Sequence, residues 1–193
     1  FFWNTSTADP RALQKLASPD RIAACWYSSG SFSIDLKFND ANTHQVALYL
    51  LDWDGWGGAR TERVEILDAA TNAVLDTRSV AGFSGGQYLV WNLAGHVVVR
   101  ITNTNPSSNA VMSGLFFGAG GGVSTPPTGT ATFVKTDTAT SGTWKGVYGA
   151  DGSQIVGETF NTPAYVSVTP SANSNFFWNT STADPRALQK LAS

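Results

Sequence analysis

The first 18 residues of the chain, FFWNTSTADPRALQKLAS, recur without a single change as residues 176–193. Because residue 176 repeats residue 1, the two copies are offset by 175 residues, and the 193-residue chain is one full period plus an 18-residue overlap. An old duplication would have accumulated substitutions, so the copies are recent, kept identical by selection, or engineered. A fixed period predicts a repeat architecture and decides how the rest of the chain is interpreted.

The boundary between repeat units is expected at residues 119–130, which contain only Gly, Ala, Val, Ser, Thr and Pro. Small uncharged residues with a Pro-Pro pair are typical of extended inter-domain linkers. On this frame residues 1–118 are the larger, C-terminal part of one unit, and residues 131–193 are the N-terminal part of the next. We therefore expect a window from a tandem array, seen in a permuted frame. A deliberate circular permutant with a duplicated segment is the alternative.

The duplication has a physical consequence for assembly. One folded unit has a single place for the strand that this segment supplies, so residues 1–18 and residues 176–193 compete for it. The copy that does not occupy this place is either unbound or completes a neighbouring molecule. Such an arrangement permits strand exchange between subunits. The sequence leaves open which copy occupies the place.

The composition indicates an exported protein. Charged residues make up 13% of the chain, about half the usual quarter, and Thr, Ser, Asn and Gly fill the polar positions instead. The net charge of −2 argues against nucleic-acid binding, which needs a basic face. No apolar run approaches the ~20 residues of a membrane-spanning helix, so we expect no membrane insertion. The single cysteine, Cys25, is interpreted as a small buried strand residue.

Alternation of apolar and polar residues, the pattern of half-buried strands, dominates the chain. Strands are predicted at residues 131–136, 164–169, 176–178 (or the identical 1–3), 21–27, 31–38, 44–52, 63–67, 73–79, 87–92, 96–102 and 110–117. About ten short strands separated by turn residues predict an all-β fold, a jelly-roll-like antiparallel β-sandwich. The only helix considered is a short one at 184–191, where Asp184 can cap the helix and Pro185 suits its first turn.

Four stretches carry a resemblance to a known kind of module: residues 44–54, Tyr88–Trp91, Met112–Phe117 and 144–152. In them the chain resembles the β-sandwich repeat modules of large secreted and surface proteins of bacteria, and it is similar to galactose-binding-like jelly rolls such as carbohydrate-binding modules. The resemblance implies the sandwich fold and an extracellular or cell-surface location. It implies no catalytic or ligand signature.

The sequence offers little for catalysis. The Ser-hydrolase, zinc-protease and phosphate-loop motifs do not occur, and His44 and His96 each begin a predicted strand away from any Ser or Cys motif. Paired carboxylates for glycoside hydrolysis stay open, because they come from different strands, but the low charge density disfavours them. We predict a protein that is not an enzyme and has no cofactor.

One loop is a candidate for ligand binding, Asp52-Trp-Asp-Gly-Trp-Gly-Gly-Ala-Arg60. Trp53 and Trp56 could stack on sugar rings while Asp54 and Arg60 bond hydroxyl groups. Asp52 and Asp54 could also offer oxygens to Ca²⁺, although the loop does not fit the EF-hand pattern. The simpler interpretation is that Asp52 caps a turn and Trp53 belongs to the core. Trp56, surrounded by glycines, is the residue most expected to be exposed.

A second candidate stretch contains Trp144, Tyr148 and Asp151, for which ordinary packing is the better interpretation than a glycan-binding edge.

The duplicated segment opens with three consecutive aromatic residues, Phe1, Phe2 and Trp3, repeated as Phe176, Phe177 and Trp178. Three such residues occupy both faces of a strand, so part of that surface needs another layer or another subunit to cover it. This is the strongest interaction signal in the chain.

Two functions are therefore expected to compete. The first is a structural or adhesive repeat module that forms a stalk or filament with neighbouring copies of itself by exchanging the duplicated segment. The second is a carbohydrate-binding module displayed in tandem, with polysaccharide as its partner.

Overall fold

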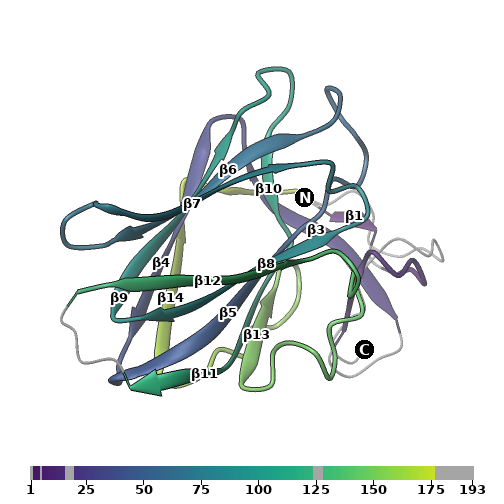
Figure 1. Ribbon diagram of the computed structural model, residues 1–193. Coiled ribbons are helices and arrows are strands. Elements are labelled where there is room, and N and C mark those ends of the chain that lie inside the picture. Colours follow the sequence, from purple (N-terminus) through teal and green to yellow (C-terminus); the bar gives the residue numbers. More distant parts are fainter. Residues whose placement is uncertain (1, 5, 16–19, 124–127, 177–193) are drawn as a thin grey trace.

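The computed structural model describes residues 2–4, 6–15, 20–123 and 128–176. Two five-stranded antiparallel sheets face each other as a β-sandwich (Figure 1). The first sheet has the order β12 (Thr130–Asp137), β8 (Gln87–Ala94), β5 (Asn42–Leu50), β11 (Gly114–Val123) and β13 (Gly152–Ile155). The second has the order β14 (Val166–Ser171), β4 (Ser31–Phe38), β9 (His96–Asn103), β6 (Thr61–Asp68) and β7 (Val74–Ala81).

A third, smaller sheet is built around β3 (Arg21–Ser28) at one end of the sandwich. Its other members are β1 (Phe2–Asn4), β2 (Leu13–Gln14), β10 (Ala110–Met112) and β15 (Ser174–Phe176), each antiparallel to β3. The predicted all-β class and antiparallel sandwich are confirmed. The described residues form fifteen strand segments, several of them only two to four residues long, where the sequence predicts about ten.

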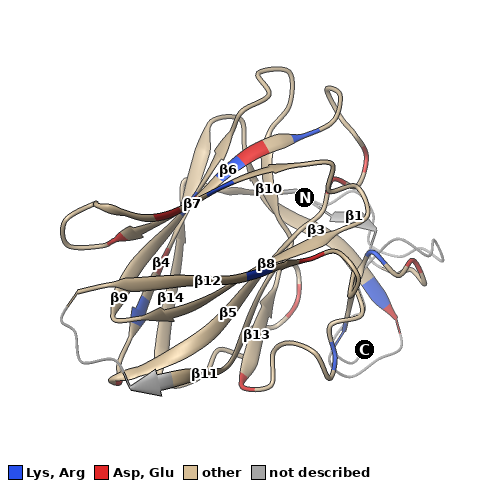
Figure 2. Ribbon diagram, in the orientation of Figure 1, with Lys and Arg blue, Asp and Glu red and all other residues tan. Residues whose placement is uncertain are grey.

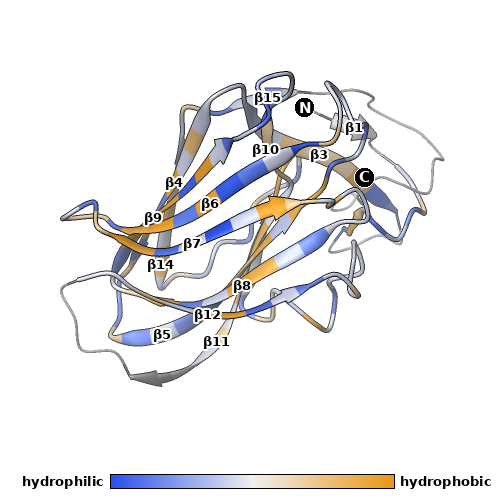
Figure 3. Ribbon diagram, turned by 45° about the horizontal axis from the view of Figure 1, so that its top comes forward, coloured by the Kyte–Doolittle hydropathy of each residue, from blue (hydrophilic) through white to orange (hydrophobic). Residues whose placement is uncertain are grey.

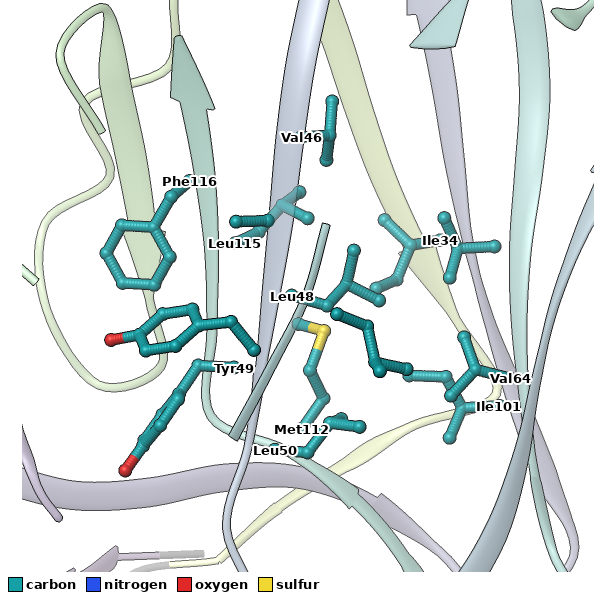
Figure 4. Close-up of a cluster of buried hydrophobic side chains, with 14 of the residues drawn as sticks. Ile34, Val46, Leu48, Tyr49, Leu50, Val64, Ile101, Met112, Leu115 and Phe116 are labelled. Atoms are coloured by element: carbon teal, nitrogen blue, oxygen red, sulfur yellow. The ribbon is translucent and has the colours of Figure 1, made fainter. Parts of the chain in front are cut away.

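The core lies between the two large sheets. Alternation places Phe32, Ile34, Leu36 and Phe38 of β4 inward, all at most 6% exposed. Figure 4 shows Ile34, Val64 and Ile101 from the second sheet meeting Leu48 and Leu115 from the first, with Met112 between them. The hydropathy colouring of Figure 3 shows the same alternation along the strands of both sheets. Burial of this apolar surface is the main stabilising contribution to such a fold.

The stretch expected to be a linker contributes in part to the sandwich. Its first residues, 119–123, continue β11, where Ala119 pairs with His44 of β5. After the connection, β12 pairs with β8 and β14 pairs with β4. Residues 130–176 thus complete the sandwich formed by the preceding part of the same chain. In an array of identical units, the same strand pairs could form between neighbouring units. The assignment of residues 1–118 and 131–193 to two units therefore stays a prediction.

The helix considered at 184–191 lies outside the described residues, but its sequence also occurs earlier in the chain. In that earlier copy Asp9 Oδ1 accepts a hydrogen bond from the Arg11 backbone N–H at 2.9 Å, and Leu13 and Gln14 form β2. The aspartate therefore closes a turn before a strand and caps no helix. No helix that could span a membrane is found in the described part of the chain.

Candidate functional site

The edge of β3 brings both ends of the repeat period together. Ser174, Asn175 and Phe176 of β15 pair with Tyr27, Trp26 and Cys25. Because β10 pairs with Trp26 and Tyr27 as well, β15 and β10 lie on opposite edges of β3. In Figure 3 β15 lies close to β1.

The register of β1 continues that of β15. The next β3 residue after Cys25 is Ala24, and its partner is Phe2. Phe2 is the counterpart of Phe177 in the duplicated segment. The first copy therefore starts at the residue pair that the second copy would reach by simple continuation of β15. A bulge follows between Phe2 and Asn4, after which β2 pairs Leu13 with Ile22.

The main chain of the first copy is also held by hydrogen bonds to residues outside β3. The Gln14 N–H donates to the Gly142 carbonyl at 2.7 Å, and the Gly142 N–H donates to the Pro10 carbonyl. The Trp144 indole N–H donates to the Gln14 carbonyl, and the Tyr49 hydroxyl donates to the Arg11 carbonyl. These bonds use main-chain atoms of the first copy, so they fix its path.

Side-chain packing adds specificity. Ala12 and Leu13 are fully buried. A Cβ at Gly142 would overlap the Ala12 backbone, and a Cβ at Gly114 would lie 2.6 Å from Leu13 Cδ1. Two glycines therefore make room for two neighbouring residues of the first copy. We call the surface formed by Arg21, Ile22, Tyr49, Gly114, Gly142 and Trp144 the slot.

Charged groups of the first copy are also paired. Lys15 is fully buried, and its Nζ lies 2.8 Å from Asp20 Oδ2. Burial alone would raise the pKa of Asp20, but hydrogen bonds from Lys15 and Ser6 lower it below its usual value. Arg11 donates to the Ser84 carbonyl at 2.9 Å and lies over the Trp53 ring at 5.2 Å. A buried lysine without a partner would be strongly destabilising, so these contacts are part of the fit.

The structure describes only some of the predicted assembly residues. Phe2 and Trp3 lie in β1 and Phe176 lies at the end of β15. Phe1, Phe177 and Trp178 lie outside the described residues. The aromatic start of the segment is therefore the point where the two copies meet.

The predicted ligand-binding loop is organised by one internal arginine. Arg60 is 2% exposed, and its guanidinium donates to the carboxylates of both Asp52 and Asp54. Its Nε donates to Asn109 Oδ1 at 2.9 Å. The oxygens considered for Ca²⁺ thus face a guanidinium, and among the described residues no group of three or more His, Cys, Asp or Glu could hold a metal ion. Figure 2 shows the charged residues spread over strands and loops.

Trp56 is the solvent-facing residue of that loop. Its side chain is 57% exposed, and its backbone carbonyl accepts a hydrogen bond from Ser108 Oγ at 2.8 Å. Asn105 Nδ2 donates to the Ala59 carbonyl at 3.0 Å. The loop is therefore fixed by its neighbour, and Trp56 is displayed on a defined backbone.

Glu62 lies behind this loop as a buried carboxyl group. Its Oε2 accepts the Val111 backbone N–H at 2.9 Å, and within the described part of the chain Oε1 has no hydrogen-bond partner. Burial raises the pKa of Glu62 to about 8, against a smaller opposing effect of Arg60. Burial therefore favours the neutral form of Glu62 in the folded protein.

Trp144 and Tyr148 pack into the molecule. Trp144 contacts Phe116 at a ring distance of 5.0 Å, and Tyr148 stacks on Tyr88 at 4.4 Å. The Tyr148 hydroxyl donates to Asp137 Oδ2 at 2.6 Å, and Asp151 accepts from Tyr165. Tyr148 is only 6% exposed, so it has little ring surface to offer a sugar beside Trp56.

The slot residues could not be selected from sequence. Tyr49, Gly114 and Gly142 come from distant parts of the chain and carry no motif. The one available signal is the duplication, which identifies the segment but not its partner. Searches against protein-family models, curated proteins and solved structures found no match for this chain.

Proposed function

We propose that this chain is a non-catalytic, extracellular structural or adhesive repeat module of a bacterial surface protein. Its copies assemble end to end into a stalk or filament by exchanging the duplicated segment, within a jelly-roll-like sandwich. The observation that carries the proposal is the register at β3, where Phe2 pairs with the residue next to the partner of Phe176. One molecule thus has one slot and two identical segments for it.

The energetics support exchange between molecules. A segment bound to a neighbour makes the same contacts as one bound within its own chain, so the two states differ little in enthalpy. Concentration and tethering then decide the balance, and a tandem array supplies a high effective concentration. Low charge also reduces repulsion between copies.

Light scattering on two matched variants tests this function. Leu13 in the first copy and Leu188 in the second are counterparts. Leu188→Asp disables the spare copy, so we expect it to stay monomeric at concentrations where the unaltered chain forms polymer. Leu13→Asp likewise leaves one competent copy for the one slot, so we expect it to be monomeric as well. A monomeric unaltered chain, or a Leu188→Asp variant that polymerises equally well, would contradict the proposal.

A carbohydrate-binding module is the second candidate, favoured by the exposed indole of Trp56. A ring displayed on a fixed loop is suited to stacking on a sugar face, with the amphipathic character of Trp. Trp56→Ala should abolish retention on a polysaccharide column if this candidate holds. Val147→Ala serves as control, since Val147 is similarly exposed at 52% and offers no aromatic ring. Equal retention of both variants would exclude Trp56 as the binding residue.

A further inference from the structure

We infer that the second copy of the duplicated segment is itself a ligand of the slot, and that it enters by replacing the first copy stepwise along β3. This inference rests on the proposed exchange function and adds its route. The replacement begins at Ala24, where the ladder of β15 ends and that of β1 begins.

The first step is set by the register. Phe176 is already paired with Cys25, and continuing this register by one residue would reach Ala24. When Phe2 separates from Ala24, the equivalent residue of the second copy can pair there without any change of register. Ordinary domain swapping requires the exchanged element to dissociate before its replacement binds. Here the second copy can replace the first along β3 one residue pair at a time.

Each later step exchanges a contact for an identical one. Ala12, Leu13, Gln14 and Lys15 recur at an offset of 175 residues, as Ala187, Leu188, Gln189 and Lys190. Every group of the slot that binds the first copy, including the Gly142 carbonyl and the Trp144 indole, therefore meets the same group in the second. The free energy of the filled slot is the same at both ends of the route.

The slot cannot hold both copies at once. Leu13 and Ala12 are 0% exposed, and even one methyl group added at Gly142 would overlap the Ala12 backbone. Close-packed interiors of this kind leave no space for a second segment. Binding is therefore exclusive, and one copy is always available for another slot.

The inference predicts that either copy of the duplicated segment can fill the slot. The unfolding temperature of the full chain measures this. Leu13→Asp and Leu188→Asp should each stay within about 2 °C of the unaltered chain, because the intact copy fills the slot. The double variant should lose about 10 °C or more, since burying a charge at this position leaves no competent copy. If Leu13→Asp alone falls as far as the double variant, the second copy does not use the slot and the inference is wrong.

A rescue experiment keeps the test decisive even if the double variant unfolds. A synthetic peptide with the sequence of residues 1–18 is added to the full-length double variant, and the same peptide with Leu13→Asp is the control. We expect the first peptide to restore most of the lost unfolding temperature and the second to restore none. Failure of the first peptide would overturn the inference.

The two proposals fail differently. Redundant stability in a chain that never polymerises would leave the second copy as a ligand of the slot and would remove the assembly function. The opposite result is also possible to recognise. If Leu188→Asp abolishes polymer but Leu13→Asp is as unstable as the double variant, the assembly function stands and the inference about the slot is wrong. Both measurements are made at about 1 µM and repeated at higher concentration, so replacement within one chain is separated from binding between chains.

Discussion

Gly142 is the residue at which the slot meets the duplicated segment most closely. A Cβ there would overlap the Ala12 backbone, while the backbone of Gly142 bonds both Pro10 and Gln14. We expect Gly142→Ala to lower the free energy of unfolding by about 1–3 kcal/mol, as overpacking does in other interiors. Unlike Leu13→Asp, it alters the slot, so neither copy can compensate.

Gly85 supplies the matched control for this measurement. It belongs to a neighbouring loop, its carbonyl accepts a hydrogen bond from Ser141, and a Cβ there would meet nothing within 4 Å. Gly85→Ala should change the free energy of unfolding by less than about 0.5 kcal/mol in urea titrations. Equal effects of the two substitutions would mean that the close contact at Gly142 does not determine the fit.

Glu62 makes a second residue-scale prediction, concerning pH. Its folded pKa is raised to about 8 from an ordinary value of 4.5, chiefly by burial. Between these two values the folded state keeps the proton and the unfolded state has lost it, so stability falls as the pH rises. Glu62→Gln imitates the protonated group and should be more stable than the unaltered chain at pH 8, by about 4 kcal/mol.

At pH 5 the advantage of Glu62→Gln should be much smaller than at pH 8, because pH 5 lies only slightly above the unfolded pKa of 4.5. Thermal unfolding of both proteins at several pH values between 5 and 8 measures the difference. A difference that does not change with pH would show that Glu62 is ionised in the folded state.

At the scale of the strands, the shared register on β3 can be tested by cross-linking. A quadruple variant carries Phe2→Cys, Phe177→Cys and Ala24→Cys, with Cys25→Ala to remove the native thiol. Directly opposed strand residues have Cβ atoms ~5 Å apart, within reach of a disulfide after small adjustments. We expect two alternative products after oxidation, one linking residues 2 and 24 and one linking residues 24 and 177.

Mass spectrometry of the digested protein identifies both cross-links, and a non-reducing gel separates links within a chain from links between chains. Moving the acceptor cysteine from Ala24 to Val98, on the second large sheet, gives the control. Absence of the link between residues 24 and 177 would show that the second copy does not reach this position.

The strands themselves were largely predictable from sequence. Ser31–Phe38 was predicted with the bounds of β4, because its alternation is complete and turn residues follow it. The expected strand at 110–117 is two strands, because Ala110–Met112 pairs with β3 while Gly114–Val123 pairs with β5 of the first large sheet. β2 and β13 were not predicted, because two to four residues are too few to show a period.

Of the slot and the segment that fills it, only the segment could be predicted from the sequence. The duplication identified the segment from Phe1 onward, but its partners Tyr49, Gly114 and Gly142 are assembled by pairing of distant strands. The short helix considered at 184–191 shows that local sequence rules can also mislead. Asp9, Pro10 and Ala12 satisfy local rules for a helix start, yet the slot binds them as a turn that leads into β2. Long-range packing overrides local preference there.

At the scale of the whole molecule, the described chain closes on itself. Phe176 and Phe2 occupy consecutive positions along β3, so one peptide bond could join them without a change of register. The 175-residue period is therefore a closed ring of strands, and the chain could begin at any loop of it. Proteins whose ends lie together usually tolerate this kind of permutation.

A permuted chain tests this closure. It begins at Thr130, runs to Phe176, continues directly into Phe2 and ends at Val123. The joined strand keeps every described contact of the slot, and the connection at 124–129 is no longer needed. Because only one copy of the segment is left, we expect a monomer with the same circular dichroism spectrum and an unfolding temperature no lower than that of the 193-residue chain. A permuted chain that fails to fold would show that β15 and β1 do not form one continuous strand. One that folds but still polymerises would show that copies associate through a surface other than the slot.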